Sequence, residues 1–309
     1  MGGKFRFVRL DAAENIFFER ELEHVRAQSY DIKYPALKAR VLIPLDTTVD
    51  PGAETVKYEQ YDSVGVAALL ASYAHDLPRV DVKGREFRSP IKGLGNSFGY
   101  SVQEIRAARM AGKPLEARKL QAARKAVEEK LDRILAFGDG LSGLLGFLNQ
   151  PNALAYVIPA GNGGLTKWAS KTPDEILADL NGACLYMVDQ TRGVETPDTL
   201  VLPDEQFGII ATTPRSATSD TTILDYWLKT NPWVRNVESW HKLKGAGAGV
   251  TDRAVFYRRS PDALQGIIPQ EFETFPPEAK GLEFEVACHM RTGGVVVYYP
   301  LSICYADGI

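Results

Sequence analysis

The pentapeptide Gly95-Asn96-Ser97-Phe98-Gly99 is the part of the sequence that comes nearest to a catalytic motif. It fits the pattern Gly-x-Ser-x-Gly, in which a strained turn between a buried strand and a helix exposes a nucleophilic serine. His241 and His289 lie downstream and could complete a triad. However, residues 85–94 are polar and broken by Pro90, and the next helical pattern begins only near residue 101. The context favours a pliable glycine-rich segment, and a serine hydrolase through Ser97 remains the lower alternative.

Two glycine-rich stretches, residues 161–164 and 245–249, could be mistaken for phosphate-binding loops. Such a loop lies between a strand and a helix, and in the Walker form its lysine follows the second glycine. Residues 245–249 precede a strand-like run, and Lys244 comes before the glycines. We therefore interpret both stretches as turns.

The histidines and cysteines do not have the spacing of metal ligands. The carboxylates also show no pair that stands out as an acid–base couple. We therefore expect no catalytic residue, no cofactor and no metal. An odd number of scattered cysteines favours reduced thiols in an intracellular protein. The residues concerned are His24, His75, His241 and His289, and Cys184, Cys288 and Cys304.

The composition is that of a soluble globular protein. Of 309 residues, 45% are hydrophobic and 24% charged, which allows one large domain or two ordinary ones. The formal charge of -3 argues against binding nucleic acid through a basic surplus of the whole chain. A local basic face remains possible, and residues 106–133 are the longest candidate. No segment approaches the ~18 apolar residues of a membrane span, and the N-terminus lacks the apolar run of a signal peptide.

The first hundred residues predict one helix followed by extended chain. Apolar spacing predicts a helix over residues 11–29 and a strand over 39–45. Alternation predicts a strand over residues 55–61, whereas residues 77–84 are polar and turn-rich. Residues 85–100 contain three glycines and a proline, and we expect extended chain that needs another surface to lie against.

The strongest local signal is a pair of helices. Ser101 and Glu104 have the spacing of a capping box, which predicts a helix from there to about Met110. After the break at residues 112–114, a second helix is expected from Leu115 to Phe137, roughly 34 Å long at ~1.5 Å per residue. Its apolar residues form one stripe, which predicts that one face packs on a sheet (Leu120, Ala123, Val127, Leu131 and Ile134).

The remainder predicts mixed structure, so the fold class is α+β. A helix followed by a strand is expected within residues 173–190, and a helix over 222–230. We interpret Trp227, Trp233 and Trp240 as core or interface anchors. The last two β runs, 282–290 and 294–299, predict a hairpin. Further extended segments are expected at residues 199–202, 208–211, 234–243 and 253–258.

Several phrases in the sequence, in their order, resemble the encapsulin-like family of tailed-bacteriophage major capsid proteins. The resemblance covers most of the chain and depends on the order of the phrases. They are Tyr30-Asp31-x-Lys33-Tyr34-Pro35, Ile43-Pro44, residues 51–55, 61–65, 76–81, 103–108, 111–115, 122–126, Gly138-Asp139, 146–149 and 291–295.

The resemblance implies the Hong Kong 97-type capsid fold and a structural protein that is not an enzyme. Such subunits assemble as hexamers and pentamers into an icosahedral head shell that encloses phage double-stranded DNA. A cargo-enclosing encapsulin shell is the alternative. The implied parts are an N-terminal arm (1–48), a long β-hairpin called the E-loop with its base (49–97), a peripheral domain with a spine helix (98–148), an axial domain (149–255) and a return to the peripheral sheet (256–309).

The resemblance also implies partners and an assembly interface. The partners would be further copies of the chain, portal, scaffold and decoration proteins, and packaged double-stranded DNA held by weak non-specific contact, with no membrane. Assembly in the host bacterial cytoplasm and residence in the virion would follow, without covalent cross-links. The E-loop residues expected to contact other subunits are Tyr58, Tyr61, Arg79, Lys83, Arg85 and Arg88.

Overall fold

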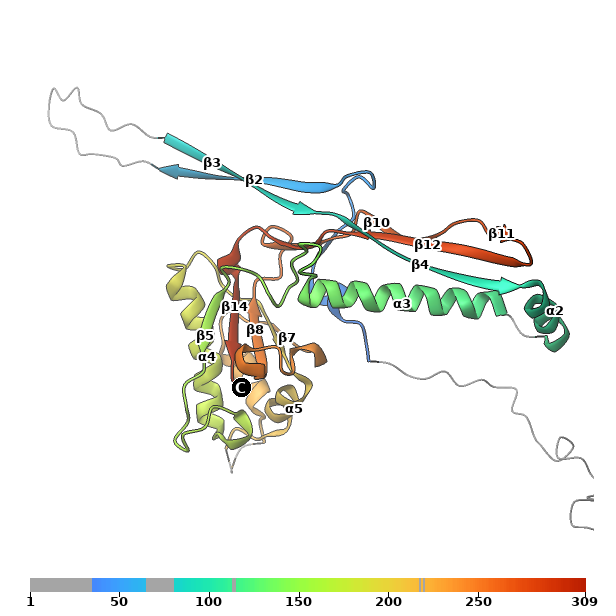
Figure 1. Ribbon diagram of the computed structural model, residues 1–309. Helices are drawn as coiled ribbons and strands as arrows, with labels where there is room; N and C mark the ends of the chain where they lie inside the picture. The colour runs from blue at the N-terminus through green and yellow to red at the C-terminus, as the bar shows by residue number, and fades with distance from the viewer. Residues whose placement is uncertain (1–34, 65–80, 113–114, 217, 219) are drawn as a thin grey trace, which may run out of the picture. The chain divides into compact units, whose positions relative to one another are not determined.

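A computed structural model describes residues 35–64, 81–112, 115–216, 218 and 220–309 (Figure 1). The chain divides into two units, residues 1–36 and 37–309. The helix expected over residues 11–29 lies outside the described residues. Everything that follows concerns the second unit.

A five-stranded sheet forms the centre of one part of this unit. Its order is β5 (Leu154–Val157), β14 (Ile303–Asp307), β8 (Arg253–Tyr257), β6 (Thr199–Leu202) and β7 (Asn236–Ser239). Alternate residues of its strands enter two different cores. Leu200 and Phe256 pack with α4 (Pro173–Gln190), α5 (Asp204–Thr212) and α6 (Ile223–Thr230), whereas Val201 and Val255 pack with the other core. The sheet is therefore buried on both faces.

Two strands expected in this region are helical instead. The strand expected in the second half of residues 173–190 is part of helix α4, which continues to Gln190. The strand expected at residues 208–211 is part of helix α5. Gln206 and Ile210, four residues apart, are the buried residues of α5. A short apolar run cannot be assigned to strand or helix by periodicity alone, and here packing against the sheet selects the helix. The expected helix at 222–230 and strands at 199–202 and 253–258 are confirmed.

A long helix and a long sheet form the second part. Helix α3 (Leu115–Phe137) has the predicted ends, and Ala123, Val127, Leu131 and Ile134 of its predicted stripe are buried. It runs along β4 (Lys92–Ser101) and β12 (Glu283–Thr292), which pair antiparallel over ten residues (Figure 1). On its other edge β12 pairs with β10 (Gln270–Thr274) and β11 (Glu278–Lys280). We call these four strands the long sheet.

Helix α2 (Val102–Ala111) begins with the predicted capping box. The Ser101 hydroxyl accepts a hydrogen bond from the Glu104 amide at 3.1 Å, and the Glu104 carboxylate accepts one from the Ser101 amide at 3.0 Å. Gly112 ends the helix with φ 64°, a left-handed conformation that glycine adopts without strain. The capping prediction is confirmed in full.

The prediction of a hairpin between residues 282–290 and 294–299 is wrong. Strand β13 (Gly294–Val297) pairs with β9 (Leu264–Ile267) in a separate three-stranded sheet that also contains β1 (Leu45–Asp46). Gly294, with φ 70°, turns the chain away from β12. A side chain there would lie 2.6 Å from the carbonyl oxygen of Leu145, so the turn needs glycine.

The prediction of a strand at residues 39–45 is also wrong, because residues Ala39–Leu42 form the short helix α1. The Ala39 amide donates to the Asp132 carboxylate of α3 at 2.9 Å, and the Tyr257 hydroxyl donates to the Leu42 carbonyl at 2.7 Å. Both hydrogen bonds are buried and satisfy the ends of the helix. Tertiary contacts here override the strand preference of the sequence.

Strands β2 (Thr55–Val64) and β3 (Asp81–Pro90) form a two-stranded antiparallel hairpin with ten residue pairs. The strand expected at 55–61 and the extended chain expected at 85–100 are confirmed. The turn-rich expectation fails for residues 81–84, which belong to β3. Residues Lys92–Ser101 form β4 of the long sheet. Residues 256–309 were expected to return to the sheet of the peripheral domain, but β14 lies in the five-stranded sheet.

Candidate assembly surfaces

The hairpin β2–β3 exposes both of its faces. All residues of β3 from Asp81 to Arg88 are exposed, and only Ser89 and Pro90 at its base are half-buried. In the part of β2 with described side chains, only Val56 and Tyr58 are half-buried. Paired residues of an antiparallel hairpin point to the same side, and neighbouring pairs point to opposite sides. Both sides of the hairpin therefore meet solvent in the isolated subunit.

Tyr58 anchors the base of the hairpin to its own subunit. Its ring stacks on Phe87 of β3 with centroids 5.1 Å apart and meets the ring of Tyr298 edge-on at 5.0 Å. The Tyr58 hydroxyl donates to the carbonyl of Val297 at 3.3 Å, and burial raises the pKa of this hydroxyl. The ring thus fixes where the hairpin leaves the body of the subunit.

Tyr61, Lys83 and Arg85 lie further along the hairpin, whereas Arg88 is paired with Lys57, nearer to the base than Tyr58. Tyr61 is 64% exposed, packs over Gly84 and donates its hydroxyl to Glu59. Lys83 stands opposite Asp62 and Arg85 opposite Gln60, on the side that also holds Tyr58. The structure thus places five of the predicted residues on one hairpin, while Arg79 lies outside the described residues (Tyr58, Tyr61, Lys83, Arg85 and Arg88).

The charges of the hairpin are partly paired with one another. Arg88 lies 2.5 Å from Glu86, and Lys57 lies 3.1 Å from the same carboxylate. These hydrogen bonds, Arg88 first, lower the pKa of Glu86. Exposed ion pairs of this kind contribute little to stability because water screens them. The charged side chains of the hairpin therefore remain open to contact with another molecule.

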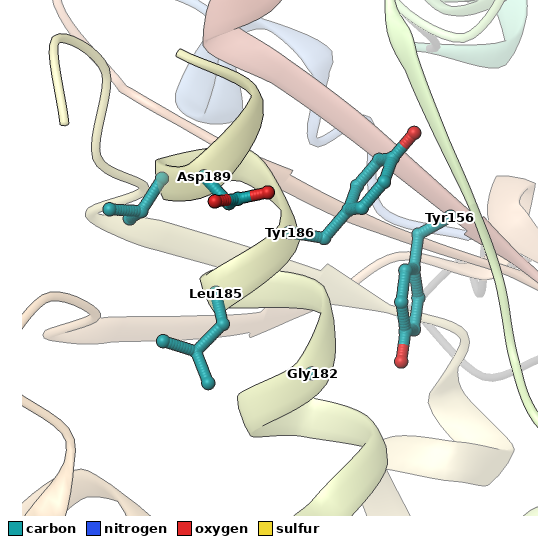
Figure 2. Close-up of a pocket in the computed structure, with 6 residues that line it drawn as sticks. Tyr156, Gly182, Leu185, Tyr186 and Asp189 are labelled. Carbon is teal, nitrogen blue, oxygen red and sulfur yellow. The ribbon is translucent and has the colours of Figure 1, made fainter. Parts of the chain in front are cut away.

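An open apolar hollow of about 550 Å³ lies beside α4 (Figure 2). Tyr156 of β5 and Tyr186 of α4 line it with ring centroids 5.5 Å apart, and Leu185 is 54% exposed. A side chain at Gly182 would lie 2.4 Å from the Tyr156 hydroxyl, so glycine allows β5 to approach the helix. The sequence analysis did not predict this surface. The signal was Leu185, an apolar residue of α4 that does not share the helix face of the buried residues Cys184 and Met187.

A second groove, of about 320 Å³, lies where the hairpin meets the five-stranded part. Gln60 of β2 lines one side, and Val194, Glu195 and Leu301 line the other. Glu195 is only 6% exposed, with its Oε2 atom 3.1 Å from Arg258 Nε. Burial raises the pKa of Glu195, and Arg258 opposes this shift. No motif in the sequence pointed to this buried carboxylate.

The structure contradicts the nucleophile-elbow hypothesis for Ser97. Ser97 lies in the middle of β4, paired with Ala287 of β12, and no turn or helix follows it directly. Lys280 and then the Ser97 hydroxyl lower the pKa of Glu285. The ring of His289 lies over Gly93, where a side chain would come within 2.9 Å of Nε2. His241 belongs to η3 (His241–Leu243), outside the long sheet. The motif instead lies along β4, where Gly93, Gly95, Ser97 and Gly99 alternate and leave one side of the strand with small side chains only.

The other candidate sites fit their structural interpretations. Gly164 and Gly247 take part in turns, with amides that donate to the carbonyls of Gly161 and Thr251 at 2.8 Å in each case. Burial raises the pKa of Cys184 and of Cys304 to about 12, which keeps both thiols protonated. The tryptophan prediction is confirmed for Trp227 and Trp240, which are fully buried.

Within the described ranges, no group of three or more histidines, cysteines or acids could hold a metal ion. In the same ranges, none of the helices combines the length and the apolar character needed to cross a membrane.

The family model of major capsid proteins matches residues 65–309, which is most of the sequence. The chain belongs to this family. No curated protein matches it. Among solved structures, this major capsid protein is similar to the capsid of Myoviridae phage XM1, with a TM-score of 0.83, 19% identity and coverage of 96% of this chain and 99% of that one.

Other capsid-like structures are similar at lower scores. Mycobacterium phage Bobi gives a TM-score of 0.63 at 14% identity, covering 94% of this chain and 96% of that one. The virus-like particle from Pyrococcus furiosus gives 0.55 at 12% identity, covering 86% and 91%. These likenesses confirm the predicted fold, and the higher scores belong to phage proteins. The encapsulin alternative is not better supported.

Proposed function

We propose that this major capsid protein builds the icosahedral head of a tailed phage from hexamers and pentamers, around double-stranded DNA and in the cytoplasm of a host bacterium. Membership of the family and the likeness to phage capsids support a structural role in the virion, in which copies of the chain contact one another. Portal, scaffold and decoration proteins are the further partners that this role implies. The role requires no catalysis and no cofactor.

The observation that carries the proposal is the exposed hairpin β2–β3. A two-stranded hairpin is marginally stable alone, and this one packs on its own subunit mainly through Tyr58 and its neighbours. Beyond Tyr58 and the half-buried base, the described side chains of the hairpin, Glu59 to Asp62 and Asp81 to Arg88, are exposed and contribute little to the core of a single subunit. Lying on a neighbouring subunit would cover one side of the hairpin and stabilise both molecules.

Within the hairpin, the proposed roles differ between base and outer part. Tyr58 sets the direction of the hairpin from its own subunit, whereas Tyr61, Lys83 and Arg85 of the outer part contact the neighbour. Arg88, which is paired with Lys57 near the base, belongs to the same proposed contact. Arg79, also predicted from the sequence, belongs to the same proposal. Each contact contributes modestly, but every subunit makes several, so a closed shell gains stability by multivalency.

The apolar surface beside α4 is a second candidate contact between subunits. Leu185 (54% exposed), Val157 (83%) and Val194 (76%) are large apolar side chains left open to solvent. All three belong to or flank α4 and β5, the elements that form one side of the five-stranded part. This position suits contacts between neighbouring axial domains around the centre of a capsomer.

The five structural parts are kept as a proposal with two changes. The E-loop is β2, β3 and the residues between them, and the residues from Lys92 onward belong to the peripheral domain. The last strand, Ile303–Asp307, belongs to the axial domain. The arm, the spine helix α3 and the remaining boundaries stay as the resemblance implies.

Deletion of residues 52–90 tests the proposal. The Ile91 amide donates to the carbonyl of Glu54 at 2.8 Å, three residues after Pro51, so the two ends that the deletion joins start close together. We expect the shortened protein to remain as capsomers or smaller species when electron microscopy and light scattering show shells for the full chain. Normal particles from the shortened chain would contradict the proposed role of the hairpin.

A double variant, Lys83→Glu with Arg85→Glu, tests the same surface without cutting the chain. Both side chains are exposed and lie outside the cores, so the free energy of unfolding should change little. We expect fewer shells at equal protein concentration because the charge of the contact is reversed. The matched control is Lys167→Glu with Lys229→Glu, which changes the same net charge at exposed positions in the other part of the subunit.

A further inference from the structure

The long sheet has one face covered by α3 and one open face. The Asn96 side-chain amide donates to the Ala123 carbonyl of α3 at 2.9 Å, so the even-numbered residues of β4 face this helix. The odd-numbered residues point to the other face, and all four of them are exposed and small (Gly93, Gly95, Ser97 and Gly99). On the side of the sheet away from α3, β4 therefore offers mainly its backbone.

The free edge of β4 offers backbone hydrogen-bonding groups as well. Among the described strands, β4 pairs with β12 alone. The Val102 amide donates to the Leu282 carbonyl at 3.0 Å, and the register continues this pairing at every second residue of β4. The amides and carbonyls of the odd-numbered residues therefore point away from β12. One of these carbonyls, that of Gly99, accepts from Lys119 at 2.7 Å, and the rest of the edge is open to pairing with a further strand.

This edge carries none of the features that keep strand edges from pairing. Proteins protect exposed edges with charged residues, proline or a bulge. Residues 93–100 contain no charged residue and no proline, and β4 pairs with β12 without a shift in register. An uncharged, regular edge is a template for another strand, which gains affinity through main-chain hydrogen bonds.

Acids of the neighbouring strands give the open face a negative charge. By the register of β10, β11 and β12, four acids lie on this face (Glu273, Glu278, Glu283 and Glu285). Two bases lie on the same face and have contacts within the subunit. Lys280 pairs with Glu285, and Arg291 donates to a backbone carbonyl, that of Pro51. Acids outnumber bases even when both bases are counted, so a strand that carries positive charge fits this face best.

The first residues of the chain have a matching composition. Residues 4–10 lie outside the described residues, and their sequence is Lys-Phe-Arg-Phe-Val-Arg-Leu. They contain three bases, four apolar residues and no acid. Bases and aromatic residues alternate from Lys4 to Phe7, so in a strand the two kinds would point to opposite sides. Phe98 and Tyr100 of β4, half-buried on the side of α3, offer an apolar surface to the aromatic side.

We propose that residues 4–10 of a second copy pair with the free edge of β4 as an additional strand. Lys4 and Arg6 lie over the small residues of β4, which leave room for long side chains to reach the acids of β12. Phe5 and Phe7 lie on the side of α3, beside the aromatic residues of β4. The inference rests on the proposed function, because it requires contact between copies, and it names the segment and the surface of one such contact.

Binding of a labelled peptide of residues 2–12 to the unassembled full chain, followed by fluorescence anisotropy, tests the pairing directly. Ser97→Pro removes an edge amide that points away from β12, so the pairing of β4 with β12 is retained. We expect the peptide to bind this variant about tenfold more weakly, because one hydrogen bond is lost and the proline ring obstructs the edge. Unchanged affinity would overturn the inference.

Two triple variants test the charge without touching the edge. The first removes three acids of the open face (Glu273→Gln, Glu278→Gln and Glu283→Gln). It should bind the peptide more weakly, and its difference from the unchanged protein should shrink as salt is added. The matched control removes three exposed acids elsewhere and should bind like the unchanged protein (Asp204→Asn, Glu238→Gln and Asp262→Asn). Equal affinity of the two triple variants for the peptide would contradict the proposed contact.

Amide hydrogen exchange in residues 94–100 tests whether the added strand comes from a second copy. The edge amides should exchange fast in unassembled subunits, slowly in shells of the full chain, and fast again in shells of a chain that lacks residues 2–10. Slow exchange already in unassembled subunits would assign the strand to the same copy, against the inference. Slow exchange that persists in shells after the deletion would assign the contact to another segment, with the same consequence.

These measurements can fail without the proposed function failing. Shells whose β4 edge exchanges fast would overturn the inference and leave the capsid role intact. Absence of shells from the unchanged protein under conditions that assemble its relatives would instead count against the proposed function. The peptide titration uses unassembled subunits, so it decides the pairing in either case.

Discussion

The hairpin β2–β3 and the helical layer over the five-stranded sheet use charged residues in opposite ways. In the helical layer, Lys171 and Asp179 have side chains only 1% and 2% exposed and lie 2.6 Å apart. On the hairpin, Lys57, Glu86 and Arg88 are paired at similar distances but are 40–63% exposed. Similar ion-pair geometry therefore has different consequences in the two regions.

The difference follows from solvation. A buried charge that loses its partner has no water to replace it, so the buried pair determines whether the subunit folds. The exposed pairs gain little from each other and can exchange their partners for those of another molecule at small cost. The fold and the assembly of the subunit should thus be separable by mutation.

The largest effect is expected from Asp179→Ala. Asp179 accepts hydrogen bonds from Lys171 at 2.6 Å and from the Trp168 indole at 3.0 Å, and burial outweighs Lys171 in raising its pKa. The substitution leaves both donors buried, so we expect a loss of about 3–5 kcal/mol in the free energy of unfolding. Urea unfolding of unassembled subunits measures it.

The control for this prediction is Asp174→Ala. Asp174 lies 2.6 Å from Arg215, but its side chain is 74% exposed. We expect a change of about 0–1 kcal/mol there. Equal losses at the two positions would mean that burial does not distinguish the ion pairs, and the comparison between the two regions would fail.

A smaller, local effect is expected from Tyr58→Ala. The substitution removes the stacking on Phe87 and the edge contact with Tyr298, each worth about 0.5–1.5 kcal/mol. Amide hydrogen exchange should become faster in peptides from residues 55–62 and 82–90, with little change in the five-stranded sheet. Exposed Tyr61→Ala is the matched control and should leave exchange near that of the unchanged protein. Faster exchange throughout the subunit would show that the hairpin is part of the folding core.

The parts of the fold that were predictable depend on local signals. The capping box at Ser101 and the ends of α3 depend on residues within one or two turns, and both predictions are confirmed. Helix α1 depends instead on Asp132 and Tyr257, 93 and 215 residues away along the chain. The pairing of β12 with β4 rather than β13 is likewise a choice between distant partners, which the sequence pattern does not contain.

The candidate surfaces divide in the same way. Sequence patterns predicted the strand at residues 55–61 and the extended chain at 85–100, whereas the hairpin that joins β2 to β3 was implied only by the resemblance to capsid proteins. The inward turn of Glu128 and Asp132 of α3 depends on Arg40 and Lys242 from distant segments, which no local pattern indicates. The apolar hollow beside α4 could not be predicted, because it forms only where β5 packs against α4. Surfaces made by one segment could be predicted, and surfaces made by several could not.

The smallest effect is expected where the two regions meet, at Glu195 in the groove beside Gln60 of the hairpin. Its pKa is raised, so between the ordinary value of 4.5 and the raised value the native state binds more protons than the unfolded state. The free energy of unfolding should therefore fall, relative to that of Glu195→Gln, as the pH rises through this window. Glu175→Gln gives the opposite sign, because amides of Asn162 and Thr172 lower the pKa of Glu175, and the advantage of the unchanged protein over that variant should grow with pH. The window of Glu195 lies above pH 4.5 and that of Glu175 lies below it, so urea unfolding of both variants from below to above pH 4.5 measures the two slopes. If they have the same sign, Glu195 is solvated in the subunit, and the groove under the hairpin is wetter than its 6% exposure indicates.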